Sequence, residues 1–353
     1  MKSLRKLTHI PSVVRGQSIN YRPELDGIRG LSIIVIVFHH FDYIGSHYFG
    51  GRGFLGVDIF FVLSGFLITQ ILLKYRNEGI KLRRFYLRRV ARLYPILLLS
   101  TLGLSFYLRN DYQFLDRTPA IHTILYIKNF WPWGGLFGPM WSLSAEEQFY
   151  LIFPLILLFG LKFLTKKGLS ILLTVWLGVI WCIALNESAP EFNFNADGIF
   201  NLVVFRPSII LVGALIALNI SQLEELVGRF YYASSFVLVA LIYGAITFQF
   251  PPLAGLATGL LILQLSSSVT ERYRIARGIK AILSFAPLAW VGLLSYSIYI
   301  WHLPMIFFST DHFTIQAITN IPLFLGKLLI VGALSFYIIE RPILKLIAKR
   351  GAR

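Results

Sequence analysis

Arg29 and His40 are two titratable side chains that lie eleven residues apart, at the start of and within the first long apolar stretch of the sequence. In an α-helix, eleven residues turn through roughly 1100°, about 20° past three full turns, so both side chains share one face. The rise of about 1.5 Å per residue separates them by about 16 Å. If 30–48 spans a membrane, Arg29 lies at its entrance and His40 near the midplane, where an ionisable group is costly and marks a candidate site. His39 is turned about 80° from this face and is the weaker candidate.

The chemistry that His40 offers is proton transfer or nucleophilic attack. An imidazole has an ordinary pKa of about 6.5, so at neutral pH it can accept the proton of a hydroxyl group as a general base. It can also attack an acyl group and form a covalent acyl-imidazole. A carboxylate beside it would orient the ring, and the sequence GPMWSLSAEEQFYLIFP supplies Glu146 and Glu147 at the start of an apolar helix, just after Ser142. We expect Glu146 to be the one that faces inward.

A second cluster is the loop KYRNEGIKLRRFYLRRVARLYP, in which eight basic residues stand against the single acid Glu78. If 85–94 is helical, Arg88 and Arg92 are four residues apart and Arg89 and Arg92 are three apart, so they share a face. Planar guanidinium groups bind phosphates through paired hydrogen bonds, which predicts a polyphosphate clamp. The alternative is an ordinary cytoplasmic loop that touches anionic lipid.

Other polar side chains inside apolar stretches need partners. Tyr299 and His302 lie in SYSIYIWHLP, and Asp58 and Ser64 lie in GVDIFFVLSGFLIT. Because His302 precedes Pro304, the alternative is that it is a hydrogen-bonded structural residue at a helix kink. Metal binding is not expected, because the adjacent histidines 39 and 40 diverge on a helix and no HExxH motif is present.

Composition places the chain in a membrane. Of its 353 residues 56% are hydrophobic and only 14% are charged, against about 25% charged residues in soluble domains. The net charge of +16 is spread over loops between apolar spans, which indicates the positive-inside rule and not nucleic-acid binding. The single cysteine, Cys182, excludes an intrachain disulfide.

Hydropathy predicts an all-α polytopic membrane protein with about ten spans and no separate soluble domain. Basic residues fall on alternate loops, with 220–229 near neutral, so both termini are expected in the cytoplasm. We divide the chain into a cytoplasmic segment 1–29 without a cleaved signal peptide, a transmembrane domain 30–347 and a cytoplasmic tail 348–353. The longest external segment is 110–140. The spans are expected near 30–48, 54–73, 93–109, 143–163, 169–186, 199–219, 231–248, 252–268, 283–309 and 321–347.

Six segments in order along nearly the whole chain carry a family resemblance: ELDGIRGLSIIVIVFHH, GVDIFFVLSGFLIT, RRFYLRRVARLYP, MWSLSAEEQFYLIFP, SYSIYIWHLP and IIERPILK. Together they resemble the membrane acyltransferase family 3, bacterial O-acyltransferases of surface polysaccharides, in the form without an SGNH hydrolase-like domain. The resemblance implies an arginine–histidine pair, a serine–glutamate element and an Arg-x-x-Arg element near the acyl-donor entrance. These fall on Arg29 with His40, on Ser142 with Glu146, and on Arg89 with Arg92 beside Arg88. His40 and Glu146 are expected to be catalytic, and the four arginines are expected to bind the acyl donor. Asp26, Asp58, Ser64, Ser142, Tyr299 and His302 are expected as supporting polar residues.

The resemblance implies an enzyme of the bacterial inner membrane. It would transfer an acetyl group from cytoplasmic acetyl-CoA, a co-substrate and not a resident cofactor, to a hydroxyl of a polysaccharide, lipopolysaccharide or other glycan, with His40 as base. Two rivals remain. One is a proton-coupled transporter or flippase of a lipid-linked sugar, with Arg29, His40 and Glu146 as a proton relay. The other is a non-catalytic subunit of a glycan-export complex.

Overall fold

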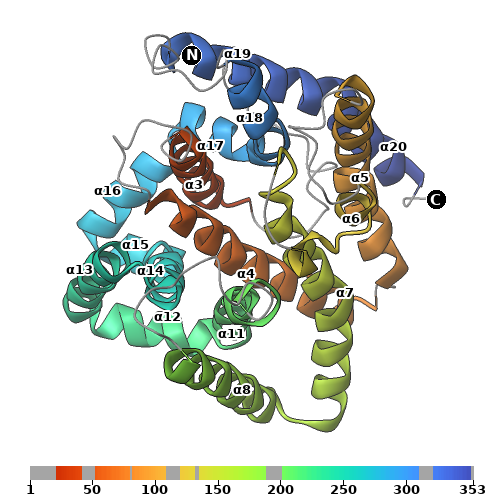
Figure 1. The fold of residues 1–353 in the computed structure, drawn as a ribbon. Coiled ribbons are helices and arrows are strands. Elements are labelled where there is room, and N and C mark those ends of the chain that lie inside the picture. Colours follow the sequence, from red (N-terminus) through yellow and green to blue (C-terminus); the bar gives the residue numbers. More distant parts are fainter. Residues whose placement is uncertain are drawn as a thin grey trace.

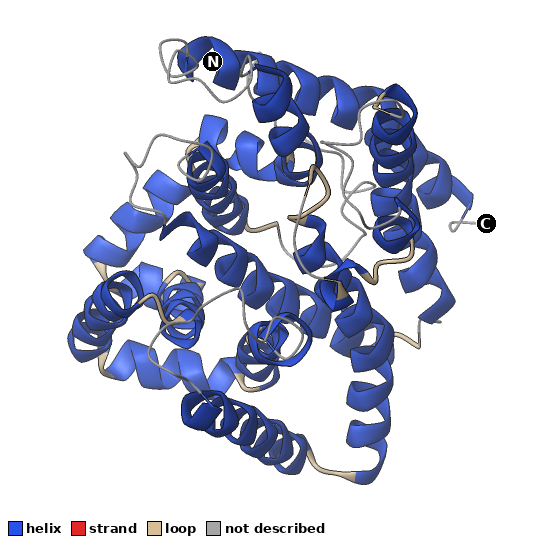
Figure 2. Ribbon diagram, viewed as in Figure 1, coloured by secondary structure: helices blue, strands red, loops and turns tan. Residues whose placement is uncertain are grey.

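The computed structural model describes residues 21–41, 52–79, 82–108, 120–131, 135–187, 201–309 and 321–350. Every regular element within these ranges is a helix (Figure 2). The N-terminal segment 1–20, the last three residues of the expected tail and parts of the external segment 110–140 lie outside the described residues.

Six described helices are long and apolar enough to cross a membrane: α4 (Leu55–Asn77), α5 (Leu82–Tyr107), α7 (Met140–Phe163), α8 (Lys166–Glu187), α13 (Tyr231–Phe248) and the continuous helix Ile321–Ile347, which contains α19 (Ile321–Leu334). Two further pairs are bent, by 82° between Val203–Leu218 and α12 (Ile220–Arg229), and by 56° between α16 (Arg274–Leu283) and α17 (Ala286–Leu293). The prediction of a polytopic all-α membrane protein is confirmed.

The expected number of ten spans stays a prediction. The described part of the chain gives six spans, or eight if each bent pair counts as one. The expected spans near 30–48 and 252–268 coincide with α3 (Pro23–Phe41), which carries three charged residues near its start, and with α14 (Pro251–Gln264), which has only 14 residues. The expected span 283–309 contains α17 of the second bent pair and α18 (Ser295–Ser309), which has 15 residues.

Helix α4 lies at the centre of the bundle, with α3, α7, α11 (Ile210–Leu218) and α14 around it (Figure 1). Its closest approach is to α11, where a Cβ atom on Gly65 would lie 1.9 Å from the carbonyl oxygen of Ile210. A Cβ on Gly213 would lie equally close to the carbonyl of Val62. Small residues let membrane helices pack backbone to backbone, which fixes α4 against its neighbour.

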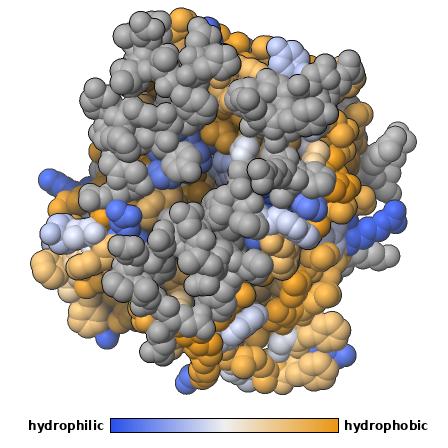
Figure 3. Space-filling view, viewed as in Figure 1, coloured by the Kyte–Doolittle hydropathy of each residue, from blue (hydrophilic) through white to orange (hydrophobic). Residues whose placement is uncertain are grey.

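Apolar side chains dominate the rim of the molecule in the view down the bundle (Figure 3). Large apolar residues stay exposed on several outer helices, as Phe236 and Tyr243 do on α13. An apolar outer surface of this kind is stable in contact with the hydrocarbon chains of lipids. A water-soluble protein rarely exposes so large a contiguous apolar area.

Helix α3 begins earlier than the first expected span. It begins at Pro23 and not near residue 30, and its described part ends at Phe41. His40 lies in the last described turn of α3, and its depth in the membrane stays a prediction.

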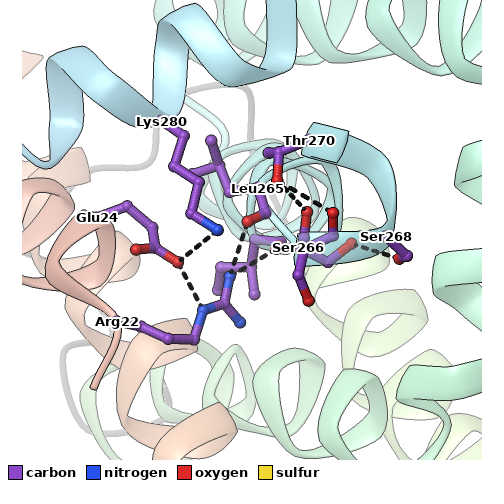
Figure 4. A network of polar contacts seen from close by, with 9 residues as sticks. Arg22, Glu24, Leu265, Ser266, Ser268, Thr270 and Lys280 are labelled. Carbon is purple, nitrogen blue, oxygen red and sulfur yellow. Dashed lines mark hydrogen bonds and ion pairs between the residues drawn. The ribbon is translucent and has the colours of Figure 1, made fainter. Parts of the chain in front are cut away.

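The start of α3 is anchored by a charged network (Figure 4). Arg22 donates through Nε to Oε1 of Glu24 at 2.7 Å and through Nη2 to the carbonyl oxygens of Ile262 and Leu265, each at 3.4 Å. These carbonyl groups lie at the C-terminal end of α14, where the positive charge of Arg22 complements the helix dipole. Lys280 on α16 lies 3.8 Å from the same oxygen of Glu24. The network lets a charged first turn pack inside the protein.

Replacing Glu24 with glutamine should destabilise the protein by about 3 kcal/mol, the lower end of the range for breaking a buried ion pair. The Glu24 side chain is 1% exposed, whereas Arg22 is 19% exposed and keeps some contact with water. Thermal unfolding of the purified protein in detergent measures the change. Lys280→Met is the control and should have a small effect, because its amine is farther away and 29% exposed. Equal melting temperatures for Glu24→Gln and wild type would contradict the anchoring role.

Candidate active site

A polar cavity of about 80 Å³ lies inside the bundle, between α3, α4, α5, α7 and α18. Roughly 10–15 Å³ of such volume admits one water molecule, so a small chemical group fits. Its apolar wall is formed by Val57, Phe60, Phe61, Leu93 and Leu143. Its polar lining consists of Arg29, Ser64, Arg89, Arg92, Ser142, Glu146, Tyr150, Ser295, Tyr296 and Tyr299.

Three arginines give the cavity its positive charge. Arg89 is held in place by Glu147, at 2.6 Å from Nη2 and 2.8 Å from Nε to Oε1, and its guanidinium carbon lies 3.1 Å from the centre of the Tyr150 ring. Arg29 and Arg92 line the same space, and Nε of Arg29 is buried without a hydrogen-bond acceptor among the described residues. Guanidinium groups that converge in this way suit an anionic or carbonyl ligand.

Glu146 is the glutamate of the pair that lines the cavity. Its Oε1 accepts a hydrogen bond from Oγ of Ser64 at 2.7 Å, and the Tyr150 hydroxyl in turn donates to the same Ser64 oxygen. Tyr150 follows Glu146 by four residues on α7, so one helix face presents both to α4. The result is a chain of three oxygen atoms that ends on a carboxylate.

The histidines form a separate pair. Nδ1 of His40 lies 2.9 Å from the carbonyl oxygen of Ile36 and 3.3 Å from Nε2 of His302, and Nδ1 of His302 lies 2.6 Å from the carbonyl oxygen of Tyr299. Because a carbonyl oxygen only accepts, each neutral ring carries its proton on Nδ1. His302 then offers its Nε2 lone pair to His40, and Nε2 of His40 is left as the basic nitrogen.

Tyr299 joins the cavity to the histidine pair. Its ring lines the cavity and lies 5.3 Å, centre to centre, from the ring of His302. Its hydroxyl donates to the carbonyl of Pro139 at 2.6 Å and lies 2.8 Å from Oγ of Ser142. His40 itself is not among the described residues that line the cavity, so the site has two parts: an arginine-rich cavity and a histidine pair beyond Tyr299.

The structure brings most of the sequence-predicted residues to these two parts, and Arg89 with Arg92 and Ser142 with Glu146 line the cavity together. Glu146 contacts Ser64 and not His40, so the expected glutamate–histidine contact is absent among the described residues. Arg88 lies outside the cavity and donates from Nη1 to the Tyr75 hydroxyl at 3.1 Å.

Two other predicted polar residues lie beside the site. Asp58 forms a buried ion pair with Arg206, at 2.9 Å to both carboxylate oxygens, and Arg206 also bonds the carbonyl of Phe54. Asp26 interacts electrostatically with Arg92. Sequence reasoning missed Arg206 and Tyr150. Helical spacing from Glu146 could have found Tyr150, whereas Arg206, 148 residues from Asp58, carries no such signal.

His302 should act as a positioning residue for His40. We expect His302→Ala to lower the turnover number about 10–100-fold, because a small displacement of a catalytic group has this effect, and to leave KM for acetyl-CoA nearly unchanged. His302→Gln should restore part of the rate, since its amide oxygen can take the place of the Nε2 acceptor. Steady-state kinetics of O-acetyl transfer separates the two parameters. A change in KM alone would point to donor binding instead.

Comparison with known proteins identifies the family of the chain. Residues 22–340 match the family described as an acyltransferase domain. The chain is 30% identical over 93% of its length to the peptidoglycan O-acetyltransferase OatA of Listeria monocytogenes. It is equally identical over the same share to the putative peptidoglycan O-acetyltransferase YrhL of Bacillus subtilis. A putative O-acetyltransferase of Staphylococcus aureus is 29% identical over 93% of the chain.

These matches cover 56%, 55% and 58% of the three relatives, so the chain spans a little more than half of their length. No solved structure matches it. The match to the family runs through α3, α4, α5, α7 and α18, which are the helices that build the cavity. The chain belongs to the acyltransferase 3 family of membrane acyltransferases.

Proposed function

We propose that the protein transfers an acetyl group from cytoplasmic acetyl-CoA to a hydroxyl of a cell-surface glycan. The observation that carries the proposal is the cavity in which Arg29, Arg89 and Arg92 converge beside an apolar wall and which Tyr299 joins to the His40–His302 pair. The arginines would hold the anionic donor, and the histidine pair would serve the acceptor.

The donor end of this path faces the predicted cytoplasmic side. The arginine-rich segment that was expected as a loop forms the start of α5 from Leu82 onward, and Arg89 and Arg92 lie in the first half of this helix. A polyphosphate held near the membrane surface would place its thioester arm against the apolar wall. Bidentate contacts from guanidinium groups suit the CoA phosphates.

At the acceptor end, His40 serves as the general base. Its Nε2 is the basic nitrogen, so it can take the proton of a glycan hydroxyl while the oxygen attacks the acetyl carbon. An acyl-imidazole on His40 is the other route that this nitrogen permits. His302 fixes the ring from the opposite side.

The acceptor is a glycan, and peptidoglycan is the one to assay first because two relatives act, or are named as acting, on it. The protein is proposed to lie in the bacterial cytoplasmic membrane, with the lipid bilayer around its apolar wall. Lipopolysaccharide and lipid-linked sugars remain further acceptors to test.

The test is the O-acetyl content of surface glycans, measured by mass spectrometry in a null strain and in the same strain carrying the wild-type gene. We expect acetyl to be lost in the null and restored by wild type, and the missing acetyl to identify the acceptor. Unchanged acetylation in the null would contradict the proposal and favour the transporter.

A further inference from the structure

Ser64 bonds differently from most of the hydroxyl groups within the described helices. Ser32, Thr69 and Thr258 each donate to the backbone carbonyl four residues earlier, at 2.7–2.8 Å, which is the ordinary way to satisfy a hydroxyl inside a helix. Ser64 instead donates to the Glu146 carboxylate on another helix at 2.7 Å. Its oxygen lines the cavity, so the pair faces the space in which the donor is proposed to bind.

We propose that Ser64 is a nucleophile that carries the acyl group as an oxygen ester between donor and acceptor, an inference that rests on the proposed function. Glu146 is placed to take the Ser64 proton, because the carboxylate already accepts the hydrogen bond from Oγ. Activation of a serine by an adjacent base is the general requirement for this kind of catalysis.

The surroundings of Ser64 suit a tetrahedral intermediate. Nε of Arg29 is buried, has no acceptor among the described residues, and belongs to a side chain that lines the same cavity. A donor of this kind stabilises the negative charge that develops on an acyl oxygen. The Tyr150 hydroxyl donates to Ser64 Oγ and so orients its lone pairs. Phe60 and Phe61 supply an apolar wall for the acyl group.

The two half-reactions balance. In the first, Ser64 Oγ forms a bond to the thioester carbon, its proton passes to Glu146, and the carbon–sulfur bond breaks to release the CoA thiolate, which takes a proton from cytoplasmic water. In the second, the glycan hydroxyl oxygen attacks the acyl carbon and gives its proton to His40. The acyl–Oγ bond breaks, Glu146 returns its proton to Ser64, and His40 releases its proton to water, which balances the proton that the CoA thiolate took up.

A second serine–carboxylate pair in the protein serves as a control for the alternative that Ser64 has only a structural role. Ser297 on α18 also donates to a carboxylate, that of Glu340, and both residues are buried, but neither lines the cavity. Ser297→Ala and Ser64→Ala therefore remove the same kind of bond, and only Ser64→Ala removes the proposed nucleophile.

The experiment incubates the purified protein with radiolabelled acetyl-CoA and no glycan, followed by denaturation and peptide mass spectrometry. We expect one acetyl group on the peptide that contains Ser64, in wild type and in Ser297→Ala, and at least a 20-fold loss of label in Ser64→Ala. Glu146→Gln should slow its formation. In Ser64→Cys, made together with Cys182→Ser, the label should become a thioester that neutral hydroxylamine removes, whereas the wild-type ester needs alkaline hydroxylamine.

Label on His40, full label in Ser64→Ala, or no covalent label on wild type would each overturn the inference. The experiments distinguish a failure of this inference from a failure of the proposed function. If the null strain loses glycan acetyl while the purified wild type forms no adduct, acetyl transfer is direct and only the role of Ser64 fails. If the adduct forms but surface glycans are unchanged, the proposed glycan acceptor fails instead.

Discussion

His40→Ala should lower glycan O-acetylation by about 10²–10⁴-fold, the contribution that a positioned general base makes. The structure supports a loss this large because Ile36 and His302 hold the ring and leave Nε2 as its basic nitrogen. The O-acetyl content of surface glycans, in a null strain that carries each variant at a matched protein level, measures the effect.

His39→Ala is the matched control for this prediction. His39 is the adjacent residue on the same helix, and its ring meets that of His40 at an angle of 71° with 5.3 Å between centres. It shares local packing with His40 but is turned about 80° from the helix face of Arg29. We expect His39→Ala to keep most of the acetylation. Full acetylation in His40→Ala would rule out the general-base role, and it is the result that the assembly-subunit alternative requires.

The sequence predicted that Arg29 and His40 share one helix, but not where that helix begins. Both residues lie in α3, and Arg29 lines the cavity. The start differs because hydropathy counts Glu24 and Asp26 as loop residues. In the structure Arg22 and Lys280 compensate Glu24, so a charged turn extends the helix toward the N-terminus. Lys280 lies more than 200 residues from Glu24 in the sequence, and a hydropathy window does not contain it.

Within one helix, spacing identified only some of the right neighbours. Arg89 and Arg92 lie in the cavity together, and Glu146, preferred over Glu147 without a spacing argument, lines it as well. Arg88 does not, because the face of α5 that points inward is set by packing against other helices and not by the spacing of arginines.

Pairs between helices could not be predicted. Ser64 and Glu146 are 82 residues apart and His40 and His302 are 262 apart. Each was recognised as a polar group that needs a partner, but a bundle of many apolar helices offers several partners for each. The choice follows from close packing, such as the contact of α4 with α11 through Gly65, which brings the helix faces into one arrangement.

Arg92→Gln should weaken acetyl-CoA binding about 10–100-fold, because a hydrogen bond to a charged group contributes about 1.5–3 kcal/mol. Arg92 lines the cavity, where Glu340 and Asp26 interact with it electrostatically. The affinity follows from the thermal shift of the purified protein on titration with acetyl-CoA, since a ligand that binds the folded state raises its stability. Arg89→Gln with Glu147→Gln removes the second arginine without leaving its carboxylate unpaired.

Arg88→Gln is the control for the donor site. Arg88 carries the same charge four residues earlier on α5 but bonds Tyr75 outside the cavity, so a general loss of positive charge would affect both variants equally. We expect the Arg88 variant to bind acetyl-CoA within about threefold of wild type, less than the change expected from one charged hydrogen bond. Equal weakening in both would indicate a general effect of positive charge and not a donor site in the cavity. A wild-type protein that gives no shift with acetyl-CoA would favour the transporter, because a flippase of lipid-linked sugars has no need to bind CoA.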